Sequence, residues 1–494
     1  MSNIFIGALI FSIWAVILFF GKTLGLSMIL FVAPISYYII YILNKNNKIQ
    51  DDKAKILIIP ITLLSATYFI FSNELFRFLN VYAIIALLVL MIIQLLGDKI
   101  KINTIISKIL GIIFEPLAYI QDTFKELKNN IKNKLNIKVD EENTKKKKNV
   151  LKSILIILPI VLVIILLLSS ADAEFAKIFK GIFREIFTLL YKIRISGIVA
   201  RVILTILLFI YFSSFFYNIS FKYKMESENT SINQTKKDNT TIAILLGVLN
   251  VIYLVFSITQ IKSLFETNSM QVYSQIARKG FFQLMIVTFI NIVSILIAKS
   301  KKFYEEAENK KYINIMCIVM CIFTFLILIA SSVRMYFYEQ AYGYTLLRIL
   351  VYCIQFTEVL LLIPTILFIL DKKVNLIKVY STIIITIYIC INFANLDNLI
   401  AKRNIDRYIE TGKIDMIYLT NNLSLDAVNQ ITRLTKLDSF LYEDTEEVKM
   451  QARMYLKEVY DCNLDERKFD IREFNLSECL SKSRIKKGVI WKIL

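Results

Sequence analysis

The chain has 494 residues, of which 56% are hydrophobic, and its 59 Lys and Arg residues outnumber 40 acidic residues to give a formal net charge of +19. Soluble domains are about 45–50% apolar, so this composition excludes a cytosolic enzyme. The sequence contains no histidine, which excludes histidine-dependent serine triads, histidine-ligated haem and nearly all catalytic zinc sites. Its six cysteines form no CxxC pair. We therefore expect an all-α, polytopic transmembrane helical bundle without cofactor or metal.

Eleven segments are long and apolar enough, or nearly so, to cross a membrane. A helix needs about 20 apolar residues to cross the hydrocarbon core. Lipid offers backbone groups no hydrogen-bond partner, so each span must be helical. The predicted spans are Ile4–Phe20, Leu24–Leu43, Ile56–Phe71, Leu79–Leu96, Val150–Leu168, Ile195–Phe216, Thr241–Ile261, Phe281–Ala298, Ile313–Ser331, Leu346–Leu370 and Val379–Leu396.

The basic residues between these spans predict the orientation of the chain. One alternate set of loops holds 28 Lys and Arg residues and the opposite set holds 11. Cytoplasmic loops carry the excess of basic residues, so the first set should be cytoplasmic. The N-terminus is then cytoplasmic, and an odd number of spans places the C-terminus outside. No basic residue precedes Lys22, so we expect a retained first helix and not a cleaved signal peptide.

Two amphipathic segments lie between spans. Ile102–Leu135 repeats apolar residues at steps of three and four, which predicts a helix with one apolar stripe. Its opposite face carries Lys101, Lys108, Lys125, Lys128 and Lys132, and Pro116 should break or kink it. We expect residues 101–148 to contact anionic lipid; a solvated linker is the alternative. The basic run Lys145–Lys148 is then a positive-inside anchor and not a nucleic-acid site. Phe175–Ile193 should lie on the outer leaflet or between spans.

Composition divides the chain into four predicted regions. They are an N-terminal four-span region (1–96), a basic cytoplasmic amphipathic arm (97–149), a seven-span core (150–402) and a small helical extracytoplasmic domain (403–494). The last region holds 16 basic and 16 acidic residues, so the net positive charge belongs to the membrane part. Cys462 and Cys479 lie in it, and their spacing leaves open whether they form a disulfide or remain free thiols.

Four polar side chains inside predicted spans stand out as functional candidates: Arg201, Asn250, Asn291 and Glu358. An ionisable group in a span costs about 2.5–3.5 kcal/mol on insertion scales, so it is a functional candidate. The alternative is that these groups hydrogen-bond neighbouring helices together. For Arg201 and Glu358 we expect a mutual ion pair or a shared water-filled cavity, because each would be costly alone.

Polar groups at the span ends predict one outward-facing cluster. By the topology above, their loops all face the same side of the membrane. The cluster would suit an anionic ligand if its arginines are partly unpaired, because Arg binds phosphate and carboxylate through two parallel hydrogen bonds. If the arginines are fully paired, it is a structural lock. Interfacial anchoring is the remaining alternative. The predicted members are Asp172, Arg278, Arg334, Tyr342, Gly343, Arg348 and Asp397.

Several of these segments resemble a known family. They are SSADAEF, YSQIARKGFF, RMYFYEQAYGYTLLR, NLDNLIAKRNIDRY and IDMIYLTNNLSLDAV, in this order between about residues 150 and 440. Together they resemble a family of bacterial multi-pass membrane proteins known as a domain of unknown function. Ala173 stands where the resemblance implies a proline. The family has no established activity, so the resemblance implies relatives and no reaction.

Three functions remain open from the sequence. The first is envelope transport or sensing in a bacterial plasma membrane, through the outward-facing polar cluster. The second is a membrane enzyme acting on a lipid-linked or cell-wall substrate, with Asp172, Glu174 or Glu339 as base and Arg278, Arg334 and Arg348 holding phosphate. The third is a structural or regulatory partner of another membrane protein, docked through residues 102–148. The sequence contains no GxxxxGK[ST] motif, which excludes ATP-driven transport by this chain alone.

Overall fold

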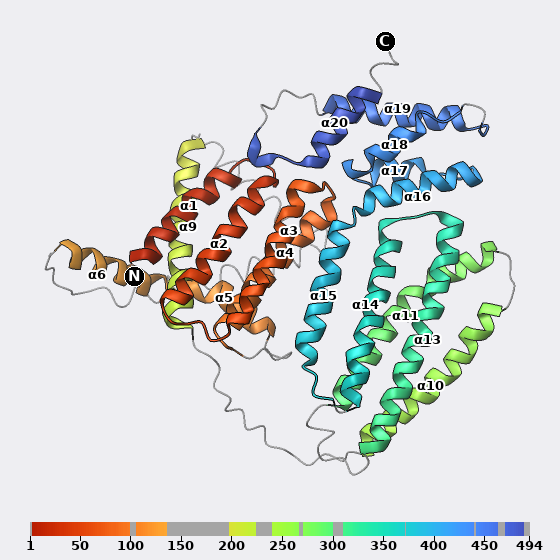
Figure 1. Ribbon diagram of the computed structural model, residues 1–494, viewed down its shortest axis with the longest axis horizontal. Helices are drawn as coiled ribbons and strands as arrows, with labels where there is room; N and C mark the ends of the chain where they lie inside the picture. Colours follow the sequence, from red (N-terminus) through yellow and green to blue (C-terminus); the bar gives the residue numbers. More distant parts are fainter. Residues whose placement is uncertain are drawn as a thin grey trace, which may run out of the picture. The chain divides into compact units, whose positions relative to one another are not determined.

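The computed structural model is helical, with no strand in the residues that it describes (Figure 1). This confirms the expected all-α helical bundle. The helices lie where the sequence is apolar for long enough to cross a membrane, because only a helix satisfies its own backbone there. The described residues are 2–98, 105–135, 197–223, 240–265, 270–299, 310–370, 372–438, 441–462 and 470–488.

Ten of the eleven predicted spans coincide with helices. Seven of these helices are long and apolar enough to cross a membrane, and α1, α10 and α11 contain shorter apolar helices. The remaining predicted span, Val150–Leu168, and the amphipathic segment Phe175–Ile193 lie outside the described residues. The ten helices are α1 (Ser2–Phe19), α2 (Leu26–Lys45), α3 (Ile58–Ile70), α4 (Glu74–Leu95), α9 (Gly197–Tyr217), α10 (Thr240–Phe265), α11 (Met270–Ala298), α13 (Lys310–Tyr342), α14 (Leu346–Ile369) and α15 (Leu376–Phe393).

Helix α13 is longer than its apolar segment. It has 33 residues, which at 1.5 Å per residue is about 50 Å, whereas the hydrocarbon core is about 30 Å thick. Residues 332–342 therefore continue the helix. The predicted spans Ile313–Ser331 and Leu346–Leu370 imply a loop at 332–345, and this prediction is wrong over most of that range. The turn to α14 is confined to residues 343–345.

The chain divides into two units, each built from separated parts of the sequence. The first contains Met1–Ile70, Arg77–Glu228 and Lys468–Asn475. In it, α1 packs on α9, and α2 on α3. The returning segment Lys468–Asn475 is bonded to this unit, which the predicted four-region division does not anticipate.

Hydrogen bonds and an ion pair attach that returning segment to the rest of the first unit. The amide of Leu26 donates to the Phe474 carbonyl at 3.2 Å, and Asn475 Nδ2 donates to the carbonyl of Tyr68 at 3.0 Å. Lys22 pairs with Asp470 at 2.8 Å. Hydrogen bonds from Arg472 and Lys22 hold the pKa of Asp470 well below its usual range.

The amphipathic arm is two helices, α5 (Ile105–Ala118) and α6 (Ile120–Leu135). The chain turns at Tyr119, three residues after Pro116, as the expected break requires. Both helices pack against α9. Lys108, expected to face the lipid leaflet, is instead bonded to Asp98 at 2.9 Å with both side chains buried. Lys125 is exposed, whereas Lys101 and Lys145–Lys148 lie outside the described residues, as do the side chains of Lys128 and Lys132.

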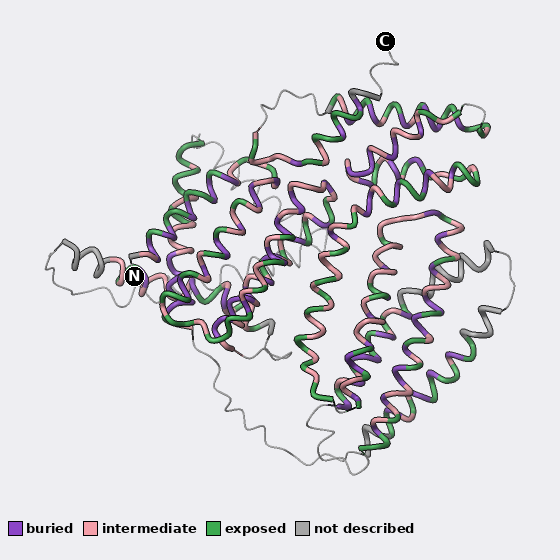
Figure 2. Tube along the Cα trace, viewed as in Figure 1, coloured by how far each residue is buried: buried purple, intermediate pink, exposed green. Residues whose placement is uncertain are grey.

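The second unit contains a bundle of α10, α11, α13, α14 and α15, with shorter helices at one end of it (Figure 1). Helices α10, α11, α13 and α14 each bury one stripe against their neighbours and leave another exposed, whereas α15 is intermediate or exposed along most of its length (Figure 2). On α10, Leu246, Asn250 and Tyr253 are buried, whereas Val248 and Val251 are more than half exposed. An exposed stripe of aliphatic side chains on a long apolar helix is the surface that lipid covers.

The C-terminal helices of the second unit share one core. It is built from the apolar faces of α16, α17, α18 and α19, and it includes Tyr344 and Leu346 from the turn between α13 and α14. Cys479 is a free, exposed thiol, and the side chain of Cys462 lies outside the described residues. The elements are α16 (Leu396–Thr411), α17 (Met416–Asn421), η3 (Leu425–Ala427), α18 (Val428–Leu434), α19 (Thr445–Cys462) and α20 (Leu476–Gly488).

Candidate functional site

The turn between α13 and α14 requires a glycine. Gly343 has a φ of +81°, a left-handed conformation that costs other residues energy. A Cβ atom at this position would lie 2.7 Å from Asn404 Oδ1 and 3.1 Å from Arg407 Nη1. The backbone of the turn therefore contacts α16 more closely than any side chain would allow.

Asn404 on α16 binds the backbone of this turn through both the oxygen and the nitrogen of its side-chain amide. Its Oδ1 accepts from the amide of Tyr344 at 2.9 Å, and its Nδ2 donates to the Tyr344 carbonyl at 2.8 Å. Tyr418 on α17 accepts from the amide of Leu346 at 2.8 Å. That amide belongs to the first turn of α14, whose N–H groups have no partner within the helix.

Two arginines complete the contact by donating to backbone carbonyls. Arg407 Nη2 donates to the carbonyls of Gln340 at 3.2 Å and Ala341 at 2.9 Å, which end α13 and lack intrahelical partners. Arg348 Nη1 donates to the Gly343 carbonyl, and its guanidinium lies 4.3 Å from the Tyr338 ring centre. We call Gly343, Tyr344, Arg348, Asn404, Arg407 and Tyr418 the hairpin clamp.

The hairpin clamp contains part of the predicted outward cluster. Tyr342, Gly343 and Arg348 lie at this turn, where Arg348 donates to the Gly343 carbonyl and stacks on the Tyr338 ring. The binding role expected of these residues stays a prediction. Arg334 lies within α13, two helical turns before its end. Asp172 lies outside the described residues, and so does the side chain of Arg278.

Asp397 belongs to the same group of C-terminal helices but has other partners. It lies in the first turn of α16 and is 1% exposed. Its Oδ2 accepts from Asn73 Nδ2 at 2.8 Å and from the Ser424 amide at 3.1 Å. Sequence reasoning missed Tyr418 and Asp426, because neither lies at the mouth of a span.

Glu358 on α14 is a buried carboxyl group within the bundle. It is 5% exposed, and its Oε2 accepts from Thr288 Oγ1 on α11 at 2.8 Å. Among the described residues, no Lys or Arg lies within ion-pair distance of Glu358. It is therefore held by a hydroxyl group and not by an opposite charge.

Glu358 continues a line of polar groups that begins near the hairpin clamp. Tyr352 Oη donates to Glu339 Oε2 on α13 at 3.3 Å. Gln355 Nε2 donates to Ser331 Oγ at 2.7 Å, and its Oε1 accepts from Ser332 Oγ at 2.9 Å. Residues 352, 355 and 358 follow one face of α14 over about 9 Å. We call Tyr352, Gln355, Glu358 and these partners, with Thr288, the polar column.

Asn250 and Asn291 join helices, as the glue interpretation expects. Asn250 Nδ2 donates to the Met316 carbonyl on α13 at 3.0 Å. Asn291 Nδ2 donates to Thr324 Oγ1, also on α13, at 3.0 Å. Both amides therefore attach a neighbouring helix to α13.

Arg201 and Glu358 belong to different units. The guanidinium of Arg201 lies 5.3 Å from the Phe20 ring centre in the first unit. The expected pairing of Arg201 with Glu358 therefore stays a prediction.

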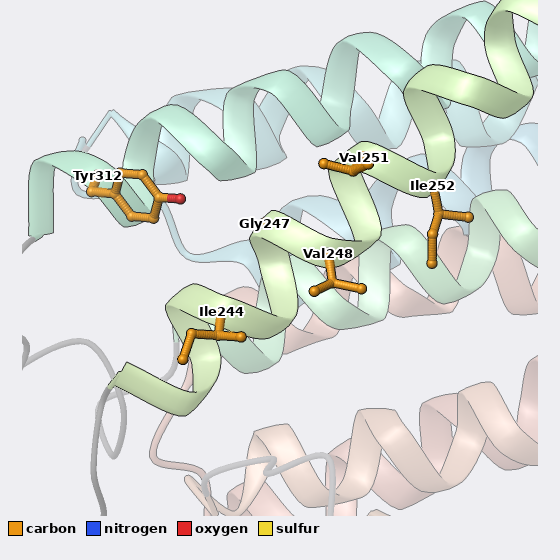
Figure 3. A pocket seen from close by; sticks show the side chains of 6 residues that line it. All are labelled: Ile244, Gly247, Val248, Val251, Ile252 and Tyr312. Carbon is orange, nitrogen blue, oxygen red and sulfur yellow. The ribbon is translucent and has the colours of Figure 1, made fainter.

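An open groove lies on the outer face of α10 (Figure 3). Its walls are aliphatic apart from Tyr312, and Ile244 and Val251 are more than 60% exposed. Such a groove suits an acyl chain and offers nothing to orient a polar substrate. The lining residues are Ile244, Gly247, Val248, Val251, Ile252 and Tyr312.

The described residues contain no group of three or more acidic or cysteine side chains arranged to hold a metal ion. Compared with known proteins, residues 58–434 match the model of one family, described as a domain of unknown function (DUF4153). The match begins almost a hundred residues before the resembling segments and includes the hairpin clamp and the polar column. No curated protein and no solved structure matches the chain.

Proposed function

We propose a role for this chain from its own residues, because it belongs to the DUF4153 family, a domain of unknown function. The role is proton-coupled transport or sensing by a multi-pass protein of the bacterial plasma membrane. Glu358 is the group that takes up and releases the proton. The N-terminus is cytoplasmic and the C-terminal helices are extracytoplasmic.

The observation that carries this proposal is a carboxyl group in the bundle that has no cationic partner among the described residues. If Glu358 only joined helices, a neutral amide such as Gln would serve equally well, as Gln355 does one turn earlier. Carboxyl groups inside membrane bundles mark ion pathways and proton relays, because the charged form is costly there and its protonation changes the local structure. The polar column supplies hydroxyl and amide groups between Glu358 and the end of the bundle.

The hairpin clamp gives the proton site a route to the C-terminal helices. Tyr352, Gln355 and Glu358 all lie on α14, whose first turn is bonded to α17 through Tyr418. A change at Glu358 that shifts α14 therefore also moves its bonds to α16 and α17. This coupling suits a sensor that reports to an extracytoplasmic domain, and equally a transporter gated at that end.

Two other functions receive less support from the same residues. An enzyme that holds phosphate through Arg348 would need its guanidinium free, and that group donates to Gly343 within the turn. For the arm, contact with anionic lipid rests on the exposed Lys125 and on residues outside the described part. Docking of a protein partner on the arm remains a separate proposal.

The experiment is a comparison of Glu358→Gln with Glu410→Gln, the same change at an exposed position on α16. In purified protein, infrared difference spectra between two pH values should show a carboxyl band. The band should persist in Glu410→Gln and disappear in Glu358→Gln. A wild-type spectrum without such a band, or a band unaffected by Glu358→Gln, would refute the proposal.

Liposomes loaded with a pH-sensitive dye then separate the two forms of the proposal. Proton entry under an imposed membrane potential, lost in Glu358→Gln, indicates transport. A titrating band without proton entry indicates sensing. Orientation is tested by an impermeant thiol reagent, which should label Cys479 in intact cells once the other five cysteines are replaced. Labelling only after lysis would reverse the orientation.

A further inference from the structure

Two buried carboxyl groups lie side by side where the C-terminal helices contact the start of α4. Asp397 is 1% exposed and Asp426 is 8% exposed. Ser424 connects them, because its amide donates to Asp397 Oδ2 at 3.1 Å and its hydroxyl to Asp426 Oδ2 at 3.1 Å. Asn73 Nδ2 completes the partners of Asp397, and the Ser72 amide donates to Asp426 Oδ2 at 3.0 Å.

The second oxygen of each carboxyl group has no hydrogen-bond partner. Asp397 Oδ1 and Asp426 Oδ1 are both buried and unpaired, and so is the hydroxyl oxygen of Ser72. Ser72 is 7% exposed, and its amide is bonded to Asp426. Three buried oxygens without partners in the described part of the chain therefore belong to side chains that are linked through the Ser72 and Ser424 hydrogen bonds.

No cationic side chain in the described part of the chain balances the two negative charges here. No Lys or Arg of these residues lies within ion-pair distance of either carboxyl group. A buried carboxylate with one unpaired oxygen is costly, because it has lost water and gained too little in return. Burial raises the pKa of Asp426 and the nearby charge of Asp397 adds to the effect, although hydrogen bonds with Ser477, Ser72 and Ser424 lower it in part.

We propose that Asp397, Asp426 and Ser72 bind one hard divalent cation, Ca²⁺ in preference to Mg²⁺. Carboxylate and hydroxyl oxygens are ligands for both ions, but Ca²⁺ accepts irregular, protein-supplied oxygen sets whereas Mg²⁺ retains most of its water. A charge of +2 would balance both carboxylates. The bound ion would join α16 and η3 to residues 72 and 73, which connect α3 to α4. This site is independent of Glu358 and of the proposed proton-coupled role.

The test is thermal unfolding of the purified full-length protein, first stripped of divalent ions with a chelator. Added Ca²⁺ should raise the unfolding midpoint by several degrees and reach saturation, because a ligand of the folded state stabilises it by mass action. Mg²⁺ should require at least tenfold higher concentrations. The shift should be abolished in Asp426→Asn and unchanged in Asp406→Asn, a control on α16 whose carboxyl pairs with Arg433 near the surface.

A second measurement covers the case in which Asp426→Asn does not fold. Tyr418 and Tyr455 lie near enough to Asp397 for its charge, together with burial, to raise the pKa of each hydroxyl. Both can therefore sensitise Tb³⁺ bound in place of Ca²⁺. Ser72→Ala, which keeps both carboxyl groups, should weaken Ca²⁺ displacement of Tb³⁺ about tenfold.

Three results would overturn the proposal. One is a wild-type protein whose unfolding midpoint does not change when Ca²⁺ is added. That result is expected if a buried water molecule or a shared proton occupies the site. Another is a Ca²⁺ shift that survives in Asp426→Asn. The third is equal Tb³⁺ displacement in wild type and Ser72→Ala.

Discussion

The two parts of α14 use polar residues in opposite ways. At its first turn, the hairpin clamp pairs both backbone groups of Tyr344 and directs Arg407 to the carbonyls that end α13. In its interior, Glu358 accepts a hydrogen bond from one hydroxyl group and pairs with no Lys or Arg in the part of the chain that the structure describes. The polar groups at the start of the helix hydrogen-bond the backbone and stabilise the turn. The carboxyl group of Glu358 makes no bond to the backbone of the described residues, so it is available for another role. The comparison predicts that changes at the turn cost stability and that a change at Glu358 costs activity.

The largest loss of stability should come from Gly343→Ala. The left-handed φ and the contact with Asn404 both oppose a Cβ atom there, and strain with broken hydrogen bonds should total about 3 kcal/mol. Chemical unfolding of the purified protein measures it. Gly247→Ala on α10 is the control, because its Cβ atom would meet only Tyr312 Oη, at 3.5 Å. Equal stability of the two variants would show that the hairpin clamp does not stabilise the turn.

Asn404→Leu should cost about 2 kcal/mol, because it leaves the amide and the carbonyl of Tyr344 without partners. Asn398, also on α16, provides a matched control as Asn398→Leu, since its Oδ1 accepts from the side chain of Gln430 at 3.1 Å and binds no turn backbone. Urea unfolding followed by tyrosine fluorescence compares them. A smaller loss for Asn404→Leu than for Asn398→Leu would contradict the clamp.

Arg407→Lys should cost about 1 kcal/mol, because the planar guanidinium holds Nη2 in a fixed position against two successive carbonyls, whereas a flexible ammonium group must lose more conformational freedom to do so. The charge is retained, so the loss reports geometry and not electrostatics. Arg433→Lys is the control, since Arg433 makes a surface pair with Asp406 and such pairs contribute about 0–1 kcal/mol. Indistinguishable variants would mean that charge alone holds the end of α13.

Glu358→Gln should have the smallest effect on stability, below about 1 kcal/mol, because an amide oxygen still accepts from Thr288. Its effect on proton uptake should instead be complete. A small effect on stability with a complete loss of proton uptake would separate the role of Glu358 most clearly from that of the hairpin clamp. A destabilisation as large as that of Gly343→Ala would show that the carboxylate is structural.

The apolar segments predicted the helices well because hydrocarbon leaves a long apolar segment no other structure. The end of α13 was missed because hydropathy marks the apolar segment and not the end of the helix. Hydropathy falls after Ser331, but the helix continues because its next residues still form backbone hydrogen bonds. Gly343 was singled out from the sequence as part of a binding cluster, and the structure adds its left-handed turn against Asn404. Its partner Asn404 lies about sixty residues further on, and no local pattern reports such a pairing. Asp426 carries no local signal, since it follows a short connection and not a span.

The returning segment Lys468–Asn475 has a consequence for how the protein is made. It supplies bonds to Leu26, Tyr68 and Lys22, yet Asn475 is synthesised 407 residues after its partner Tyr68. Until Lys468–Asn475 has been synthesised, the Leu26 amide, the Tyr68 carbonyl and the Lys22 ammonium group lack these partners. Nascent chains stalled before residue 468 should therefore be more open to proteases at the first two helices than the finished protein, and quality control can recognise them as incomplete.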